Sequence, residues 1–486
     1  METETIEAER VSYNPKAIVA GLAIAGLMLA LPAPDGLSPE GWRLAALVAL
    51  MAIWWVTEAI PVYATGLMPL VGFPLLDIAG IGAAAAPYAN PIIFLFLGGF
   101  LIAAAMQATG LHQRIALHVL ARTGTGARQL VGGFMLTAAF LSMWVSNTAT
   151  AVMMVPIAMS VIAITVADDG RHAPRGGLDV ALLLAVAYGA SIGGIATLIG
   201  TPPNAFLAGY MAQEHGLEIG FAQWMVFALP LSLVMLACCW LTLTRLAFPL
   251  DPKPIEGVAA TLGRALDDLG PIRRPEKTVA AVFFCAAAAW IAQPLIATLV
   301  PNLSDTVIAI LAALVLFIIP AGGGKPALNW EHASRVPYGL LLLFGGGLSL
   351  AAAFGSTGLA LWLAGGLGAA AGLPAILVIL LIVATIVFLT ELTSNIATTA
   401  AMVPLLAGVA VGAGIHPLLL CAPAALAASC AFMLPVATPP NAVVFGAGHV
   451  TIPQMAKAGI WLNIFAIVTV TLMAYALLGL AFPLLG

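Results

Sequence analysis

Apolar runs of about 20 residues recur along this chain, and they constrain its fold more than any other feature. A helix needs about 20 apolar residues to cross roughly 30 Å of hydrocarbon. The 486 residues are 62% hydrophobic and 8% charged, whereas soluble globular chains are about 25% charged. The runs are apolar on every face, unlike the alternating strands of a membrane barrel. We therefore predict an all-α polytopic membrane protein.

We expect eleven transmembrane helices, one for each apolar segment bounded by proline, glycine or charge. The segments fall at roughly 17–33, 42–60, 62–79, 91–107, 179–213, 222–249, 277–300, 305–320, 338–355, 416–446 and 456–485. Two further stretches, 129–165 and 374–412, are about twice too long for one crossing and carry Ser-Asn pairs at their middles. We predict that each is a re-entrant helical hairpin, because polar backbone at membrane depth must face protein or a cavity. Two true spans are the alternative.

Charge placement predicts the orientation of the chain. The acidic N-terminus lacks the basic region of a signal peptide, so the first apolar run should remain and the N-terminus should be cytoplasmic. With this topology, only Arg43 among 17 Lys and Arg residues lies outside. This is the positive-inside pattern, and we expect a multi-pass protein of a bacterial inner membrane. The net charge of −4 leaves no basic face for nucleic acid.

An internal repeat divides the chain. The shared elements are Gly98-Gly99 with Gly346-Gly347, Ser146-Asn147 with Ser394-Asn395, and Met154-Val155-Pro156 with Met402-Val403-Pro404, each 248 residues apart, and Thr201-Pro202-Pro203-Asn204 with Thr438-Pro439-Pro440-Asn441, 237 apart. An odd number of predicted spans separates the copies, so they should be inverted in the membrane. Inverted repeats with interrupted helices are the sequence sign of a secondary transporter.

The repeat gives the domain boundaries. We predict an N-terminal tail and first helix (1–40), inverted repeat 1 (41–249, with hairpin 129–165 and broken helix 179–213), a solvated cytoplasmic linker (250–277) and inverted repeat 2 (278–486, with hairpin 374–412 and broken helix 416–446). Residues 111–128 are typical of an amphipathic surface helix. All five cysteines lie in apolar stretches, and we interpret them as packing residues.

The doubled motifs carry the chemistry. Ser, Asn and Thr favour helix N-caps, so each Ser-Asn pair should end one helix and begin another whose free N–H groups point into a site. Each Pro-Pro pair breaks a helix and leaves the carbonyls of Gly200 and Ala437 free to coordinate a hard cation. We find no Lys or Arg in the predicted membrane core. An anionic substrate would then be neutralised by co-bound cations, and sodium suits hydroxyl, amide and carbonyl oxygens.

The paired motifs, together with the runs Thr57–Pro61 (TEAIP) and Thr390–Asn395 (TELTSN), resemble the divalent anion:sodium symporter (DASS) family from about residue 40 to the end. The resemblance implies import of dicarboxylates, citrate or sulfate. It also implies a homodimer in which a transport domain moves against a scaffold domain as an elevator.

Carried over by motif position, the resemblance implies two sodium sites and one substrate site. The first sodium site would use Ser142, Ser146, Asn147 and the Gly200 carbonyl. The second would use Thr390, Thr393, Asn395 and the Ala437 carbonyl. Substrate carboxylates would contact Ser146, Asn147, Thr148, Thr201, Ser394, Asn395 and Thr438. At least two sodium ions are expected.

Three residues qualify this assignment. Ile396 stands where the second motif could have threonine, which leaves citrate or sulfate as alternative substrates. Glu391 has either a structural or a coupling role, and we expect Glu58 to be structural.

We predict a sodium-coupled symporter of C4-dicarboxylates such as succinate, malate and fumarate, with a sodium-independent exchanger of the same fold as the alternative. A channel is disfavoured, because it does not require paired hairpins. An enzyme is disfavoured as well, since the chain has no HExxH motif.

Overall fold

The computed structural model describes residues 14–168, 177–251, 253–322, 324–366 and 374–482. The helices before the inter-repeat linker are α1 (Pro15–Ala30), α2 (Pro39–Val56), α3 (Val62–Thr65), α4 (Met68–Leu75), α5 (Ile81–Ala85), η1 (Ala86–Ala89), α6 (Pro91–Thr109), α7 (Leu111–Leu120), α8 (Ala127–Ser142), α9 (Asn147–Asp168), α10 (Leu178–Ile195), α11 (Pro202–His215), α12 (Phe221–Leu241) and the π-helical turn η2 (Thr242–Leu246).

The second half begins with the linker helix α13 (Val258–Asp268). It continues with α14 (Arg274–Ile296), α15 (Asp305–Ile318), β1 (Pro320–Gly322), β2 (Lys325–Pro326), α16 (Trp330–Ala333), α17 (Tyr338–Ser356), α18 (Leu359–Gly366), α19 (Ala375–Thr390), α20 (Asn395–Gly412), α21 (Leu418–Ala428), α22 (Pro439–Gly446) and α23 (Ile452–Ala481). The two strands pair antiparallel.

Eight described helices are long and apolar enough to cross a membrane. They lie in α6, α9, α10, α12 with η2, α14, α17, α20 and α23, and shorter apolar helices include α1, α15, α19 and α21. The prediction of a helical membrane protein is thus confirmed at this level.

Polar caps and prolines set where these helices begin. The Ser38 side chain accepts a hydrogen bond from Gly41 N, and the Asn90 side chain accepts one from Ile92 N. Both caps are followed directly by proline, whose missing N–H costs nothing in the first helical turn. Gly110 ends α6 in the left-handed conformation, with φ of 80°. Capping residues, prolines and glycine therefore set where helices begin and end within the long apolar runs.

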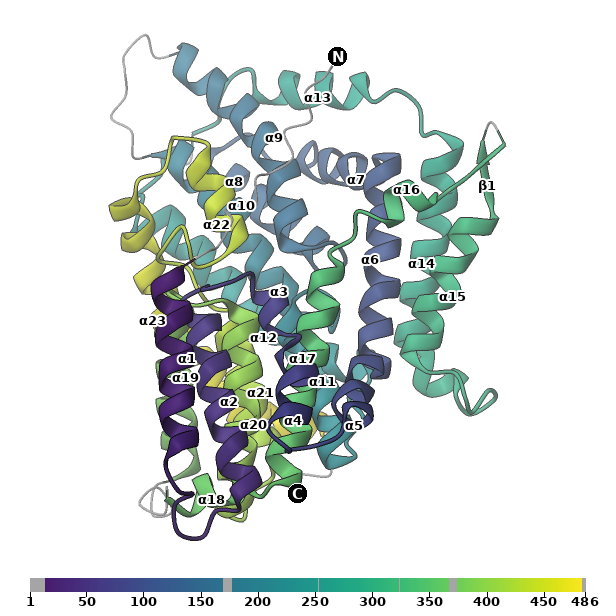
Figure 1. Cartoon of the computed structure of the whole chain (residues 1–486). Helices are drawn as coiled ribbons and strands as arrows, with labels where there is room; N and C mark the ends of the chain where they lie inside the picture. Colours follow the sequence, from purple (N-terminus) through teal and green to yellow (C-terminus); the bar gives the residue numbers. More distant parts are fainter. Residues whose placement is uncertain (1–13, 169–176, 252, 323, 367–373, 483–486) are drawn as a thin grey trace.

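Two groups of helices position the site, and they contact each other through α12 and α14. In one group, α8 packs on α10, and α10 also contacts α9, α12 and α22. In the other, α6 packs on α15, and α14 contacts both. Figure 1 shows the second group along one side of the molecule, away from α8, α9 and α10. We call these the hairpin group (α8, α9, α10, α12, α22) and the flanking group (α6, α14, α15).

Several helices are more broken than the apolar runs indicate. The expected span 62–79 contains two short helices, α3 and α4, and residues 111–128 form a helix only as far as Leu120. The linker 250–277 contains the amphipathic helix α13. Proline accounts for part of this, since Pro61 directly precedes α3 and Pro69 lies in the first turn of α4.

Candidate functional site

The two long apolar stretches both break at their Ser-Asn pairs. Helix α8 ends at Ser142 and α9 begins at Asn147, whereas α19 ends at Thr390 and α20 begins at Asn395. We call the intervening residues, 143–146 and 391–394, the first tip and the second tip. The helices flanking each tip pack against each other, as expected for hairpins.

A hydroxyl and an amide close the first tip. Ser142 Oγ donates a hydrogen bond to Asn147 Oδ1, and Ser146 Oγ accepts one from Ala149 N at 3.3 Å. Thr197 Oγ1 donates to the carbonyl of Met143 at 2.6 Å. Thr197 lies in the bend between α10 and α11, so this bond joins the tip to the broken helix.

The Gly200 carbonyl lies beside this turn, as the motif predicted. A Cβ atom at position 194 would lie 2.6 Å from Asn147 Oδ1 and 2.9 Å from the carbonyl oxygen of Gly200. Both oxygens therefore approach residue 194 so closely that only glycine fits there. Three of the four predicted ligands of the first sodium site, Ser142, Asn147 and Gly200, thus lie together.

The second tip repeats the same hydroxyl–amide pair. Thr390 Oγ1 donates to Asn395 Oδ1 at 2.8 Å and also lies 2.9 Å from the carbonyl oxygen of Ala428. Thr393 Oγ1 lies 2.6 Å from Thr398 Oγ1. Thr390 and Asn395 therefore lie together beside the end of α21, whereas the Thr393 hydroxyl bonds to Thr398 and to the Leu389 carbonyl.

The asparagine of each TPPN motif holds its bend open in the same way. Asn204 Nδ2 donates to the carbonyls of Gly194 and Thr197, at 3.4 and 2.8 Å. Asn441 Nδ2 donates to the carbonyls of Ala431 and Leu434, at 3.2 and 3.0 Å. These carbonyls are equivalent at the repeat offset of 237. The side chain replaces helical N–H donors, so the unwound backbone remains hydrogen-bonded.

Each repeat packs against the other at these bends. Helix α22, which begins at the second TPPN motif, packs on α9 and α10, whereas α11, which begins at the first, packs on α20 and α21. Figure 1 shows α22, near the C-terminal end of the chain, beside α9 and α10. The fold thus brings elements of both motif sets into contact.

Burial differs among the predicted substrate contacts. Thr201 and Thr438 are buried, whereas Ser146, Asn147, Thr148, Ser394 and Asn395 are half-buried. Ile396 is 5% exposed and belongs to the packed core. The departure from the threonine pattern therefore places an apolar side chain among apolar neighbours.

Glu391 contacts an unwound segment of the chain and no basic residue among those described. Its carboxylate accepts hydrogen bonds from the N–H groups of Phe432, Met433 and Leu434 at 2.7–3.1 Å. Asn463 Nδ2 donates to it at 2.8 Å. These contacts tie the second tip to the bend before α22. Glu58 lies between α2 and α3 with φ of 46°, as expected for a turn residue.

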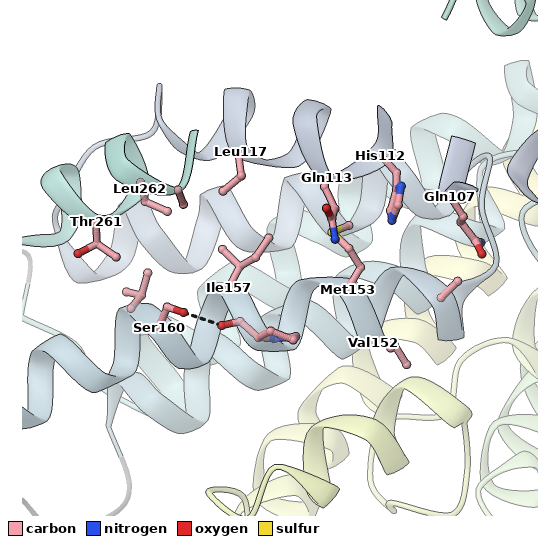
Figure 2. A pocket seen from close by; sticks show the side chains of 14 residues that line it. Gln107, His112, Gln113, Leu117, Val152, Met153, Ile157, Ser160, Thr261 and Leu262 are labelled. Atoms are coloured by element: carbon pink, nitrogen blue, oxygen red, sulfur yellow. Dashed lines mark hydrogen bonds between the residues drawn. The ribbon is translucent and has the colours of Figure 1, made fainter. Parts of the chain in front are cut away.

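A cavity of about 620 Å³ extends along α9 from near the first tip. Its walls are α9 on one side and α7 with α13 on the other, and Ala149 brings it within a turn of Asn147. Figure 2 shows Gln107, Gln113, His112 and Ser160 around it. Burial lowers the pKa of His112, and its hydrogen bond with the Met106 carbonyl oxygen partly offsets this effect. The described lining residues therefore carry no charge at neutral pH.

Sequence reasoning missed Gly194, Thr197 and the role of Asn204. Gly194 and Thr197 lie in an apolar run whose pattern does not distinguish them. Asn204 belongs to a motif that was recognised, but its contacts depend on where the chain bends back. The repeat offered a signal, since Asn204 and Asn441 are equivalent buried amides.

Fold and site together define a polytopic helical membrane protein of the transporter class. The model of the sodium:sulfate symporter transmembrane region matches residues 14–481. The chain is 40% identical to the sodium-dependent dicarboxylate transporter SdcS of Staphylococcus saprophyticus, over 98% of this chain and 94% of that protein. It is 41% identical to SdcS of Staphylococcus aureus, over 91% and 87% of the two chains.

A solved structure agrees at the level of the fold. The YdaH transporter of Alcanivorax borkumensis superimposes with a TM-score of 0.58 at 16% identity, over 92% of this chain and 100% of that chain. The chain belongs to the sodium:sulfate symporter family, which confirms the resemblance to divalent anion:sodium symporters.

Proposed function

We propose that this protein is a sodium-coupled symporter that carries C4-dicarboxylates such as succinate, malate and fumarate across the bacterial inner membrane. The observation that carries the proposal is the pair of hydroxyl–amide turns, Ser142–Asn147 and Thr390–Asn395, each beside an unwound helix. The substrate class follows from the relatives, which are named as dicarboxylate transporters.

Each tip supplies one sodium site. Ser142, Ser146, Asn147 and the Gly200 carbonyl bind the first ion. Thr390, Thr393, Asn395 and the Ala437 carbonyl bind the second. Uncharged oxygens suit a hard monovalent cation, and the closeness of Asn147 Oδ1 and the Gly200 carbonyl beside Gly194 supports the first assignment. Two or more sodium ions then offset the two charges of the substrate.

The substrate lies between the two tips. Its carboxylates contact Ser146, Asn147, Thr148, Thr201, Ser394, Asn395 and Thr438. Helices α9, α11, α20 and α22 all begin at these motifs, and their N-terminal N–H groups favour an anion. In transporters built from inverted repeats, the substrate and the coupling ions typically bind beside interrupted helices.

The arrangement in the membrane follows the sequence prediction. Eleven helices span the bilayer, the hairpins 129–165 and 374–412 re-enter it, and the N-terminus is cytoplasmic. The hairpin group belongs to a transport domain that moves as an elevator against a scaffold containing the flanking group, in a homodimer. The cavity along α9 is the release path on the cytoplasmic side, where its uncharged lining would not retain a dianion.

Uptake into proteoliposomes tests this function. We expect a sodium gradient to drive succinate uptake, and Asn147→Ala or Asn395→Ala to lower it by roughly tenfold or more, since hydrogen bonds to charged groups contribute about 1.5–3 kcal/mol. Asn329→Ala is the matched control, because this residue caps the short helix α16 and should leave uptake unchanged. Normal uptake by both site variants would refute the assigned ligands.

The same assay separates the rival functions. Replacing sodium with choline should stop net uptake, whereas uptake that continues would indicate proton coupling, with Glu391 as the candidate carrier. Counterflow of one dicarboxylate for another without sodium would indicate an exchanger. A preference for citrate or sulfate in the anion panel would favour the alternative substrates, and Ile396→Thr tests whether that position sets the preference.

A further inference from the structure

Four aromatic rings gather beside the first tip. Trp144, in the tip, stacks on Phe221 with ring centroids 6.0 Å apart and meets Phe283 edge-on at 5.1 Å. Trp290 stacks on Phe221 at 4.8 Å and lies nearly parallel to Trp144 at 6.4 Å. Aromatic pairs at these separations attract beyond the effect of their buried area.

A carboxylate completes this contact. Asp305, the first residue of α15, accepts a hydrogen bond from Phe221 N at 2.7 Å, so it caps the N-terminus of α12. Trp290 Nε1 donates to the Asp305 carbonyl at 3.0 Å. An acidic side chain at a helix N-terminus is favourable, and here it comes from a distant helix.

The cluster joins the two helix groups. Trp144 and Phe221 belong to the first tip and to α12, which packs on α10 and α23. Phe283, Trp290 and Asp305 belong to α14 and α15, which pack on α6. Any motion of one group relative to the other must therefore separate the rings and break the hydrogen bond from Phe221.

We propose that this cluster is a latch that positions the first tip against the flanking group, with Trp144 as its positioning residue. The proposal rests on the proposed function, in which the two groups move. Trp144 lies between Ser142 and Asn147 in the chain, so holding its ring holds these two of the four ligands proposed for the first sodium site. The latch also stabilises the conformation in which the cavity along α9 is open.

Single-molecule fluorescence in nanodiscs measures the lifetime of this conformation without substrate. One dye is placed on Ser160→Cys in α9 and the other on Glu331→Cys in α16, which packs on α6. Cys238 and Cys285 are replaced by serine, since the other three cysteines are buried. We expect Trp290→Ala to shorten the dwell time of the cavity-open state by about three- to tenfold, the equivalent of one or two lost aromatic pairs.

Two neighbouring phenylalanines give a matched control. Phe283 is 3% exposed and contacts Trp144, whereas Phe284 is 58% exposed on the outside of the same helix. We expect Phe283→Ala to shorten the dwell time and Phe284→Ala to leave it unchanged. Trp290→Phe keeps an aromatic ring in place, so its dwell time should be close to that of the parent protein. General destabilisation of α14 would not produce this pattern.

A dwell time in Trp290→Ala equal to that of the parent would overturn the latch, as would equal effects of Phe283→Ala and Phe284→Ala. A parent that shows a single conformation would overturn it as well. The proposed function is tested separately, by succinate uptake. If uptake were absent, the dwell times could still be measured, so the two failures are distinguishable.

Discussion

A glycine, Gly194, lies beside the oxygens of the first candidate ion site. Asn147 Oδ1 and the Gly200 carbonyl can both approach residue 194 closely because Gly194 has no Cβ atom. At the equivalent position of the second repeat the residue is Ala431, and there the second tip is held by Glu391. The two halves of the site therefore reach similar geometries through different residues.

We expect Gly194→Ala to raise the sodium concentration that half-saturates uptake by roughly tenfold. The added methyl group would meet two oxygens that coordinate the ion, and the loss of one charge-assisted contact has about this effect. Gly26→Ala is the control, since a Cβ atom there meets nothing within 4 Å. Sodium activation curves for the two variants give the comparison, and identical curves would contradict the assigned site.

Glu391 shows how one acidic residue can be satisfied without a basic partner. Three consecutive backbone N–H groups and the Asn463 amide donate to its carboxylate. Backbone N–H groups arranged in this way form a nest that favours an anion. The structural interpretation of this residue is thereby supported, although the contacts reach the bend before α22 and not the hairpin backbone.

At the scale of elements, a buried ion pair fixes α7 to the inter-repeat linker. Arg114 Nη2 lies 3.2 Å from a Glu276 carboxylate oxygen, and both side chains are less than a tenth exposed. Arg114 also donates to the carbonyls of Leu269 and Gly270. One wall of the cavity is therefore held to the start of α14.

We expect Glu276→Gln to lower the melting temperature markedly, because it leaves the Arg114 charge buried and unpaired, a change that costs about 3–5 kcal/mol. Arg335→Ala removes an exposed pair with Glu331, which contributes about 0–1 kcal/mol. Thermal unfolding of both variants in detergent compares the two pairs. Similar melting temperatures would show that the buried Arg114–Glu276 ion pair contributes little to stability.

At the scale of the whole molecule, loops rich in Lys and Arg gather at one end. Arg128 Nε donates to the carbonyl of Leu250, and Lys457 Nζ donates to that of Ala247. Figure 1 places α7 and α13 at this end of the molecule. Arg43 instead pairs with Asp77 beyond α4. This distribution agrees with the positive-inside pattern.

The predicted orientation can be tested with an impermeant maleimide on right-side-out vesicles. We expect Asp77→Cys to react and Arg122→Cys to react only after the membrane is opened, because the predicted topology places these two exposed positions on opposite sides of the bilayer. Both variants carry serine at Cys238 and Cys285. The reverse pattern would mean that the N-terminus lies outside.

The sequence by itself determined the membrane class, the doubled motifs and the two breaks at Ser146-Asn147 and Ser394-Asn395. These follow from local properties: the length of apolar runs, the capping preference of serine and asparagine, and the missing N–H of proline. The family resemblance carried by these motifs grouped Gly200 with Asn147, and the two residues lie close together in the structure.

Only the tertiary structure decided which neighbours each motif meets. Tertiary contacts surround three of these residues: two oxygens lie beside Gly194, three N–H groups around Glu391 and aromatic rings around Trp144. They come from residues 40 or more positions away or from a bend whose path is not local. An apolar run specifies that a helix is buried in lipid or protein, but not which face meets which partner. Packing of whole helices settles that, because only the folded chain brings these surfaces together.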